Sequence, residues 1–220
     1  MERDRSTDLS HLAGVRRDYL RGELREADLG PDPLPEIDRW VALAVEELGP
    51  EANAMVLATA SSDAAPAARV VLLKGRDQRG LHFFTDSTSP KGSHLDANPR
   101  AALVLYWPAL DRQLRVRGTA ARLPAAEAAA YFATRPRGSQ VAAAASHQSS
   151  VLEDRAELEE RVRSVRDATG DGPVGMPERW GGYALLPDEV EFWQGRESRL
   201  HDRIRYRREG DAWVKERLSP

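Results

Sequence analysis

The sequence predicts a mainly β fold of the α+β class, in which an antiparallel sheet or small barrel is surrounded by helices. Three observations support this prediction. Short runs of β-branched and aromatic residues recur between positions 55 and 123 and again between 180 and 217, as is typical of strands. Turn-like segments rather than helices separate most of these runs, which favours antiparallel pairing. The sequence also lacks a GxGxxG motif, so a dinucleotide-binding βαβ unit is not expected.

The composition is that of an ordinary globular protein. The chain has 220 residues, of which 41% are hydrophobic, enough for one sizeable core. A net charge of -3, from 32 basic and 35 acidic residues, gives no reason to expect a nucleic-acid or membrane partner. Because no apolar run reaches membrane-spanning length and no signal peptide is present, we expect a soluble cytoplasmic protein. The absence of cysteine excludes disulfides and thiol nucleophiles.

Helices are predicted where apolar residues recur at spacings of three and four. Leu12, Val15 and Tyr19 indicate a short helix within an N-terminal arm, residues 1–35, which ends in a proline-rich stretch. The arm is expected to pack on the rest of the protein late in folding. The rest of the chain, residues 36–220, is assigned to a single domain. Further helices are predicted over Glu36–Leu48, Ser93–Ala97, Ala125–Thr134 and Val151–Ala168.

Strands are predicted where apolar and polar residues alternate, or where a short apolar run lies between turn residues. Their spacing suggests hairpins around one core. The predicted strands are Met55–Ala60, Ala67–Lys74, Leu81–Thr85, Ala101–Tyr106, Arg112–Leu123, Trp180–Leu186, Glu189–Gln194, Arg203–Arg208 and Ala212–Arg217.

One candidate site lies near the end of the chain, where cationic or ionisable residues recur at alternate positions. In an extended segment, Arg199, His201 and Arg203 would point to the same side. Together with the indole of Trp193 they would form a cradle for a planar anionic ligand, because arginine stacks on rings and binds phosphate or carboxylate. The alternative is a solvated strand face beside a buried tryptophan.

A second candidate site is suited to phosphate and lies around residues 69 to 92. Thr85, Ser87, Ser89 and Lys91 supply hydroxyls and an ammonium just before a helix N-terminus, although the same residue types serve as ordinary N-caps. Upstream, two cations bracket a strand, at positions 69 and 74. If the strand includes both residues, their side chains point to opposite faces of the sheet. Alternatively, one of the two lies outside the line of the strand, which ends near the glycine that follows Lys74. As solvated charges at strand ends they would have no role in binding.

A third candidate site follows the predicted helix that stops before Pro136. Tyr131 and Arg135 share one helix face, and Ser139 lies four residues further on. A phenol, a guanidinium and a hydroxyl that converge there would hold a phosphate dianion. The five histidines show no metal-ligand spacing, so no metal site is expected. A catalytic triad elbow and a Walker loop are also absent.

Several short motifs occur along the chain in a specific order. They are Arg69-Val-Val-Leu-Leu-Lys74, Phe84-Thr85 followed by Ser89-Pro-Lys91, Arg112-Gln113, Tyr131-Phe-Ala-Thr-Arg135-Pro-Arg-Gly-Ser139-Gln140, Gln148-Ser-Ser150, Trp180-Gly-Gly-Tyr183 and Glu191-Phe-Trp-Gln-Gly195 with Arg199-Leu-His-Asp-Arg203. In this combination the sequence resembles the pyridoxine/pyridoxamine 5′-phosphate oxidase family, over nearly the whole chain from about Arg16.

The resemblance implies an FMN-binding split β-barrel that works as a homodimer, with two flavins in clefts between the subunits. It also implies oxidation of pyridoxamine or pyridoxine 5′-phosphate to pyridoxal 5′-phosphate, with dioxygen reduced to hydrogen peroxide. Two other functions stay open: a related FMN-dependent oxidase acting on another ring substrate, such as a phenazine precursor, and a non-catalytic carrier of FMN or pyridoxal phosphate. A phenazine precursor without a phosphate would not need the cluster of Lys74, Tyr131, Arg135 and Ser139.

The resemblance also assigns roles to individual residues. The pyridine ring of the substrate would lie against Arg199 and His201, the expected catalytic residues, and Arg16 and Tyr19 would belong to a lid over the substrate. Pro90 departs from the family, which often has an arginine beside the loop lysine. The substrate phosphate is expected to bind Lys74, Tyr131, Arg135 and Ser139. FMN is expected to contact Arg69, Val70, Val71, Leu72, Leu73, Lys74, Phe84, Thr85, Lys91, Gln113, Gln148, Ser149, Trp193 and Arg203.

Overall fold

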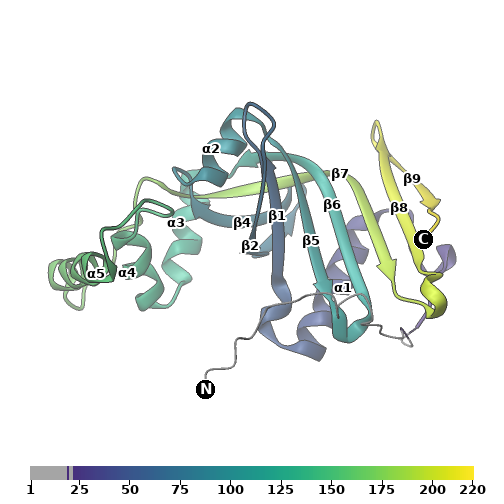
Figure 1. The fold of residues 1–220 in the computed structure, drawn as a ribbon, viewed down its shortest axis with the longest axis horizontal. Coiled ribbons are helices and arrows are strands. Elements are labelled where there is room, and N and C mark those ends of the chain that lie inside the picture. The colour runs from purple at the N-terminus through teal and green to yellow at the C-terminus, as the bar shows by residue number, and fades with distance from the viewer. Residues whose placement is uncertain (1–18, 20–21) are drawn as a thin grey trace, which may run out of the picture.

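The computed structural model describes Tyr19 and residues 22–220 and shows a curled antiparallel sheet with helices around it (Figure 1). The helix predicted around Leu12 and Val15, and the predicted lid residue Arg16, lie outside the described residues. The helices are α1 (Pro33–Leu48), α2 (Pro90–Ala97), α3 (Ala125–Thr134), α4 (Arg137–Ala145) and α5 (Arg155–Thr169). The strands are β1 (Ala54–Ala60), β2 (Pro66–Leu72), β3 (Gly75–Asp77), β4 (Gly80–Asp86), β5 (Arg100–Trp107), β6 (Arg112–Arg122), β7 (Trp180–Gln194), β8 (Asp202–Glu209) and β9 (Ala212–Arg217).

The sheet closes into a barrel. Its strands follow the order β2-β1-β5-β6-β7-β4-β3, all antiparallel. Because β2 runs on into β3, which pairs with β4, the first and last strands of this order are joined by the chain itself. The backbone N–H of Lys74, between them, donates to the carbonyl of His82 at 2.9 Å. The predicted antiparallel barrel with surrounding helices is confirmed.

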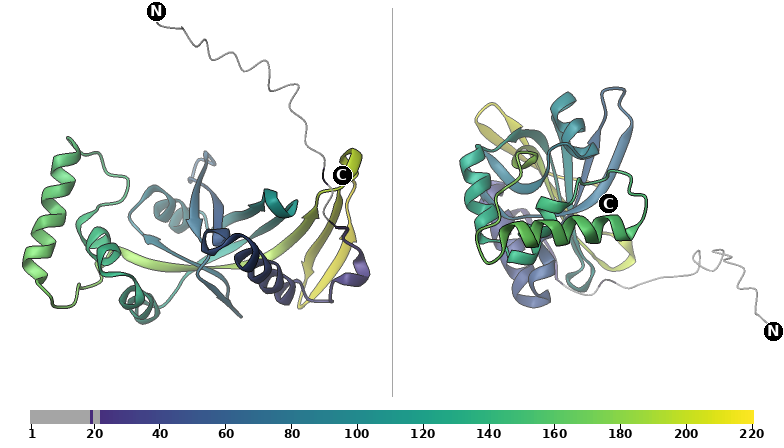
Figure 2. Two further views of the ribbon diagram at one scale, coloured as in Figure 1. Left: turned by 90° about the horizontal axis from the view of Figure 1, so that it is seen from below. Right: turned by 90° about the vertical axis from the view of Figure 1, so that its left-hand side faces the viewer.

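Strand β7 connects two distant parts of the molecule. Its first half pairs with β4 and its second half with β8, so it runs from the end that carries α3, α4 and α5 to the end that carries β8 and β9 (Figures 1 and 2). Trp180 and Trp193 stand near its two ends. At about 3.3 Å per residue, they are separated by about 43 Å of extended chain.

Two strands were predicted where β7 is continuous. The prediction of a break at Pro187 is wrong, because the pairing of β6 with β7 shifts register between Arg117 and Gly118. Arg117 lies opposite Glu189 and Gly118 opposite Pro187, so a bulge absorbs Asp188. Proline has no N–H to donate and is tolerated at such a bulge.

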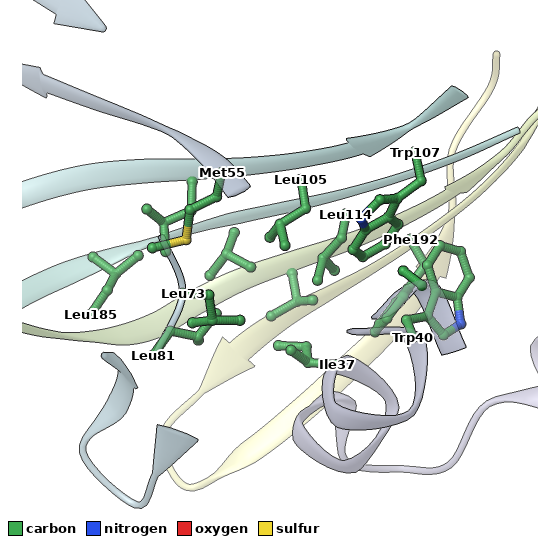
Figure 3. Close-up of a cluster of buried hydrophobic side chains, with 14 of the residues drawn as sticks. Ile37, Trp40, Met55, Leu73, Leu81, Leu105, Trp107, Leu114, Leu185 and Phe192 are labelled. Atoms are coloured by element: carbon green, nitrogen blue, oxygen red, sulfur yellow. The ribbon is translucent and has the colours of Figure 1, made fainter. Parts of the chain in front are cut away.

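The core lies between the inner face of the sheet and α1, as Figure 3 shows. Ile37 and Trp40 of α1 are about as buried as Leu105, Leu114 and Phe192 of the strands they meet. The ring of Trp40 packs edge-on against that of Phe192, with centroids 5.0 Å apart. Helix α1 begins three residues earlier than predicted. The side chain of its N-cap, Asp32, accepts from the backbone N–H of Leu34 at 2.9 Å, and Pro33 fits the first helical position.

The segment just before α1 is part of the same core. Leu24 and Leu29 are each 4% exposed, and the Tyr206 hydroxyl of β8 donates to the Gly30 carbonyl at 2.7 Å. The Nζ of Lys215 in β9 donates to the carbonyl of Leu29 at 2.8 Å. This part of the predicted arm therefore packs on β8 and β9. The division of the chain at residue 35 stays a prediction.

Helix α4 was not predicted. Pro136 ends α3 and also serves as the N-cap of α4, with φ of -52° and ψ of 139°. Only Val141 and Ala145 of α4 are buried, four residues apart, so its apolar pattern is weak. Among the described residues, no helix is long and apolar enough to cross a membrane.

Candidate active site

A cavity of about 770 Å³ lies where the exit of β2, the end of β4 and helices α2, α3 and α4 meet. Many of the residues predicted to bind FMN or the substrate phosphate line it. Those predicted residues are Val70, Val71, Leu72, Lys74, Phe84, Thr85, Lys91, Tyr131, Arg135, Ser139 and Gln148. Side chains from three separate candidate motifs thus share one cavity.

One wall of the cavity is built around a buried ammonium group. Lys91, 7% exposed, donates from Nζ to Thr85 Oγ1 at 3.2 Å, Ser89 Oγ at 3.0 Å and Gln148 Oε1 at 2.5 Å. Burial, together with the nearby positive charge of Arg69, lowers the pKa of Lys91 to about 8. A dehydrated cation among hydroxyls is suited to a phosphate, which would supply the missing countercharge.

The loop before α2 can approach Lys91 only because of a glycine. A Cβ atom on Gly92 would stand 2.1 Å from the carbonyl oxygen of Ser87, so any larger residue would push the loop away. The α2 N-terminus therefore lies directly under the hydroxyl-bearing loop, as a phosphate site requires.

Arg69 is fixed beside this wall. Its Nη1 donates to the Leu57 carbonyl at 3.1 Å and to Thr59 Oγ1 at 2.8 Å. Thr59 is in turn hydrogen-bonded to His94 Nδ1 of α2 at 3.1 Å. Burial lowers the pKa of Arg69, and this guanidinium makes no ion pair within the described residues. Its charge adds to the positive potential near Lys91.

The opposite wall carries a second cation that lacks a partner. The Nη1 atom of Arg135 is buried without a hydrogen bond, and burial lowers the pKa of this guanidinium. Its Cζ lies 5.1 Å from the ring centroid of Trp180 and 5.6 Å from that of Phe132. These aromatic rings favour the cation without neutralising it. Lys74, Tyr131 and Ser139 line the same cavity, so the predicted phosphate clamp is assembled in space.

Sequence reasoning assigned no site role to Trp180, which lines this cavity, or to Arg179, which is bonded to the lining residue Asp86. Trp180 is stacked on Phe84, with centroids 5.4 Å apart, and Phe84 is stacked on Tyr131 at 4.1 Å. Arg179 forms an ion pair with Asp86 at 3.1 Å and donates to the carbonyls of Ala143, Ala144 and Ser146 at the end of α4. These contacts span 33 to 96 residues of sequence, so no local pattern indicated them.

A second cluster lies at the far end of β7. The rings of Tyr19 and Trp193 are 5.7 Å apart, and the ring of His201 is 5.1 Å from Tyr19 and 4.6 Å from Trp193. His201 Nδ1 accepts from the backbone N–H of Arg196 at 3.1 Å, so the neutral ring carries its proton on Nε2. Burial and the nearby charge of Arg199 lower the pKa of His201.

The prediction that Arg199, His201 and Arg203 share one strand face is wrong. Glu197–Arg199 forms a 3-10 turn, in which Ser198 and Arg199 have φ of 55° and 61°. Strand β8 begins only at Asp202. Two consecutive non-glycine residues in the left-handed region are a local strain that is common at functional sites. Arg199 is exposed on this turn, close enough to His201 to affect its pKa.

Other predicted cofactor residues fall on one cross-strand row. Gln113 of β6 lies opposite Trp193 of β7, which lies opposite Arg203 of β8. In the other direction the row continues to Tyr106 of β5, and Leu72 of β2 pairs with Ala54 of β1. With about 4.8 Å between neighbouring strands, the five steps from β2 to β8 span about 24 Å along the curved sheet. The remaining predicted residues are Leu73, whose side chain lies in the core, and Ser149, exposed in a turn at φ of 68°.

The predicted site residues therefore form two groups in one chain. Trp180 stands in the cavity at one end of β7, and Trp193 stands in the ring cluster at the other end. Within the part of the chain that the structure describes, no group of three histidine or acidic side chains could hold a metal ion.

Family comparisons agree with this architecture. Residues 43–168 match the family model described as pyridoxamine 5′-phosphate oxidase. Residues 180–220 match the model described as the pyridoxine 5′-phosphate oxidase C-terminal dimerisation region. The second match covers β7, β8 and β9, the strands that carry the distant ring cluster.

Individual relatives cover almost the entire chain. A pyridoxine/pyridoxamine 5′-phosphate oxidase from Nocardioides sp. is 52% identical over 95% of this chain and 98% of its own length. One from Rubrobacter xylanophilus is 51% identical over 95% and 96%. Among solved structures, PhzG from Burkholderia lata 383, in complex with tetrahydrophenazine-1-carboxylic acid, matches with a TM-score of 0.85 and 34% identity, over 91% of this chain and 99% of its own. An FMN-binding protein from Nostoc punctiforme shares the fold at a TM-score of 0.70 and 18% identity, over 87% and 100% of the two chains.

Proposed function

Because the chain belongs to the pyridoxine/pyridoxamine 5′-phosphate oxidase family, we propose that it oxidises pyridoxamine or pyridoxine 5′-phosphate to pyridoxal 5′-phosphate, with FMN as cofactor and dioxygen as the final electron acceptor. The observation that carries this proposal is the buried Nη1 of Arg135, which has no hydrogen-bond partner and borders a cavity lined by two further ammonium groups. A ligand anion in the cavity would give this buried nitrogen the hydrogen-bond acceptor that it lacks.

The donor set of the cavity fits FMN and a phosphorylated substrate at the same time. Lys91, Thr85 and Ser89 form one cationic, hydroxyl-rich wall that would hold the FMN phosphate, with Arg69 beside it. The opposite wall would hold the substrate phosphate through Arg135 and Tyr131, together with Lys74 and Ser139. When bound, FMN supplies the capacity to accept a hydride from the substrate and to pass the electrons to dioxygen.

The site is proposed to be composite, built from two copies of the chain. Within one chain, Arg135 and His201 lie at opposite ends of β7, too far apart for one small substrate to touch both. Likewise, Leu72 and Arg203 lie on strands that are about 24 Å apart along the curved sheet. The match of residues 180–220 to a dimerisation region supports a homodimer. In a twofold dimer, the ring cluster of one copy can cover the cavity of the other.

Each group of residues then has a separate task. The phosphate clamp holds the substrate by a part that does not react, so binding energy far from the chemistry serves to align the reacting carbon. Arg199 and His201 of the second copy would lie against the pyridine ring. Because the pKa of His201 is lowered, its ring is neutral at pH 7 and would position the substrate as an Nε2–H donor.

The proposal is tested with the purified protein and with Arg135→Ala. The wild-type protein should show flavin absorbance that bleaches anaerobically on addition of pyridoxamine 5′-phosphate. Arg135→Ala should raise KM for this substrate by about 100-fold, the range for a charge-assisted bidentate contact, while flavin absorbance is kept. Lack of bleaching in flavin-loaded wild-type protein would exclude the proposed activity.

The same variant distinguishes the phenazine-type alternative, which the likeness to PhzG suggests. A ring substrate without phosphate does not use the clamp. Turnover that is unchanged in Arg135→Ala would therefore favour that alternative. A non-catalytic carrier would bind FMN without taking up dioxygen. The expected cytoplasmic location stays a prediction.

A further inference from the structure

A buried carboxylate stands beside the row of predicted cofactor residues at the far end of β7. Glu191 is 4% exposed, although it lies on the same face of β7 as Trp193. Its Oε1 accepts from Arg203 Nε at 2.8 Å, and its Oε2 accepts from Arg203 Nη2 at 3.2 Å. The same Oε2 accepts from Arg115 Nη1 at 3.0 Å. One carboxylate therefore serves two arginines, from the strands on either side.

The interaction of Glu191 with Arg203 is bidentate and fixes the plane of the guanidinium. Two parallel N–H···O bonds restrict orientation much more than a single contact does. The hydrogen bond from Glu191 also raises the pKa of Arg203. A third donor, Nη1, is bonded to the carbonyl of Ser219 at 2.9 Å. Because a guanidinium has five N–H groups, two stay available for a ligand. Arg203 lies directly opposite Trp193 in the sheet.

We propose that Glu191 is a positioning residue for FMN binding, which sets the orientation of Arg203 and does not itself touch the cofactor. The inference depends on the proposed function, in which Arg203 contacts FMN bound in the cavity of the second copy. Arg203 without Glu191 would keep its charge but lose two of its three fixed bonds, so FMN would have to order the side chain on binding.

The test compares Glu191→Gln with a matched control, Glu189→Gln. Glu189 lies on the same strand and face, but its carboxylate is 3.7 Å from Arg117 and 3.8 Å from Arg205, outside hydrogen-bond distance. Titration of the apo-protein with FMN, followed by flavin fluorescence, should show Kd raised about tenfold in Glu191→Gln. In Glu189→Gln the Kd should stay within about twofold of wild type.

A double-mutant cycle separates positioning from general stability. In an Arg203→Ala background, Glu191→Gln should leave the Kd for FMN unchanged, since the residue through which it acts is gone. Thermal unfolding and gel filtration of each variant establish that the fold and the oligomeric state are kept.

Three results would overturn the inference: an unchanged or lower Kd in Glu191→Gln, an equal loss in Glu189→Gln, or a tenfold loss that persists in the Arg203→Ala background. These failures leave the proposed function intact, because the wild-type protein would still bind FMN. Wild-type protein that binds no FMN would instead refute the proposed function, and this inference with it.

Discussion

Lys91 and Arg135 line the same cavity, and both are cations in a partly dehydrated environment. Burial lowers the pKa of both side chains, and each lacks a carboxylate partner. Asp86, an acidic residue that lines the cavity, forms an ion pair with Arg179 instead. Each cation is therefore less stable in the empty cavity than in water, and bound phosphate would offset that loss. This arrangement supports the proposed binding of two phosphate groups in the cavity.

The lowered pKa of Lys91 predicts how FMN affinity depends on pH. Because this pKa is about 8, the side chain is protonated at pH 7 and loses its charge as the pH rises through 8. Since an FMN phosphate prefers the protonated form, the Kd for FMN should rise progressively between about pH 7.5 and 9.5. The second pKa of a phosphate monoester, about 6, lies below this window. Fluorescence titrations of the apo-protein across it measure the effect.

Lys91→Met provides the control for this pH effect. The variant should bind FMN more weakly at pH 7.5 and show a nearly flat profile over the same window, since Arg69 keeps its proton throughout. A wild-type profile that is flat, or one that rises equally in Lys91→Met, would assign the titration to another group.

At the level of residues, the sequence predicted which side chains gather at a site better than it predicted the directions in which they point. Tyr131, Arg135 and Ser139 were predicted to converge from their spacing, and they line one cavity. The predicted position of Arg199 was wrong. Alternate residues share a face only where the chain is extended, and the chain turns at Ser198, which has a positive φ. Glu191 was quoted only as part of a motif, since its partner Arg203 lies on another strand.

At the level of elements, the cavity depends on how the end of α4 is held. Arg179 joins three carbonyls there to the Asp86 carboxylate of β4, which also accepts from the backbone N–H of Thr88 at 2.8 Å. The loop after α4 carries Gln148, whose amide oxygen accepts from Lys91. A single arginine thereby fixes the relative positions of α4, β4 and the loop around Lys91.

Arg179→Ala should destabilise the protein by about 3 kcal/mol, because it leaves Asp86 as a buried charge without its partner and three carbonyls without a donor. Arg137→Ala is the control, since Arg137 caps the end of α5 in a comparable way, through Gly172 and Thr169, but is exposed. Its effect should stay below about 1 kcal/mol. Urea unfolding of the apo-proteins measures both values. Equal losses would refute the special role of Arg179.

Elements with a strong apolar period were predicted well, and those set by tertiary contacts were not. Helix α1 and strands β5 and β6 lie close to their predicted bounds. Helix α4 was missed because only two of its residues are buried. Strand β7 was divided at Pro187 because a proline usually ends a strand, whereas here the bulge opposite Gly118 accommodates it. A Cβ on Gly118 would stand 2.0 Å from the Leu186 carbonyl oxygen, a constraint that the sequence alone did not reveal.

For the whole molecule, the length of β7 supports the proposal that the active site is shared between two copies of the chain. The strand places the phosphate cavity and the ring cluster about 43 Å apart along the chain, and each holds only part of the predicted site. The sequence alone could not separate the two groups, because motif order says nothing about which copy supplies a residue. In a twofold dimer, each active site would combine the cavity of one copy with the turn of the other.

This arrangement predicts complementation between two impaired variants, assayed at a substrate concentration near the wild-type KM, where each alone has little activity. Arg135→Ala damages only the cavity, and Arg199→Ala damages only the turn. In a mixed dimer, one site receives both substitutions and the other receives neither. If subunits assort at random, half of the dimers are mixed, so denaturing and refolding an equal mixture should restore about a quarter of wild-type activity. Peroxide production from pyridoxamine 5′-phosphate measures the recovery.

The control for complementation pairs Arg135→Ala with Tyr131→Phe, two changes within the same cavity. Here every site in a mixed dimer carries one substitution, so activity should not exceed the average of the two variants alone. Recovery in this pair, or its absence in the first pair when mixed dimers are present by differential tagging, would show that one chain supplies the complete site. Such a result would mean that Arg199 reaches the cavity of its own chain, and it would refute the composite site.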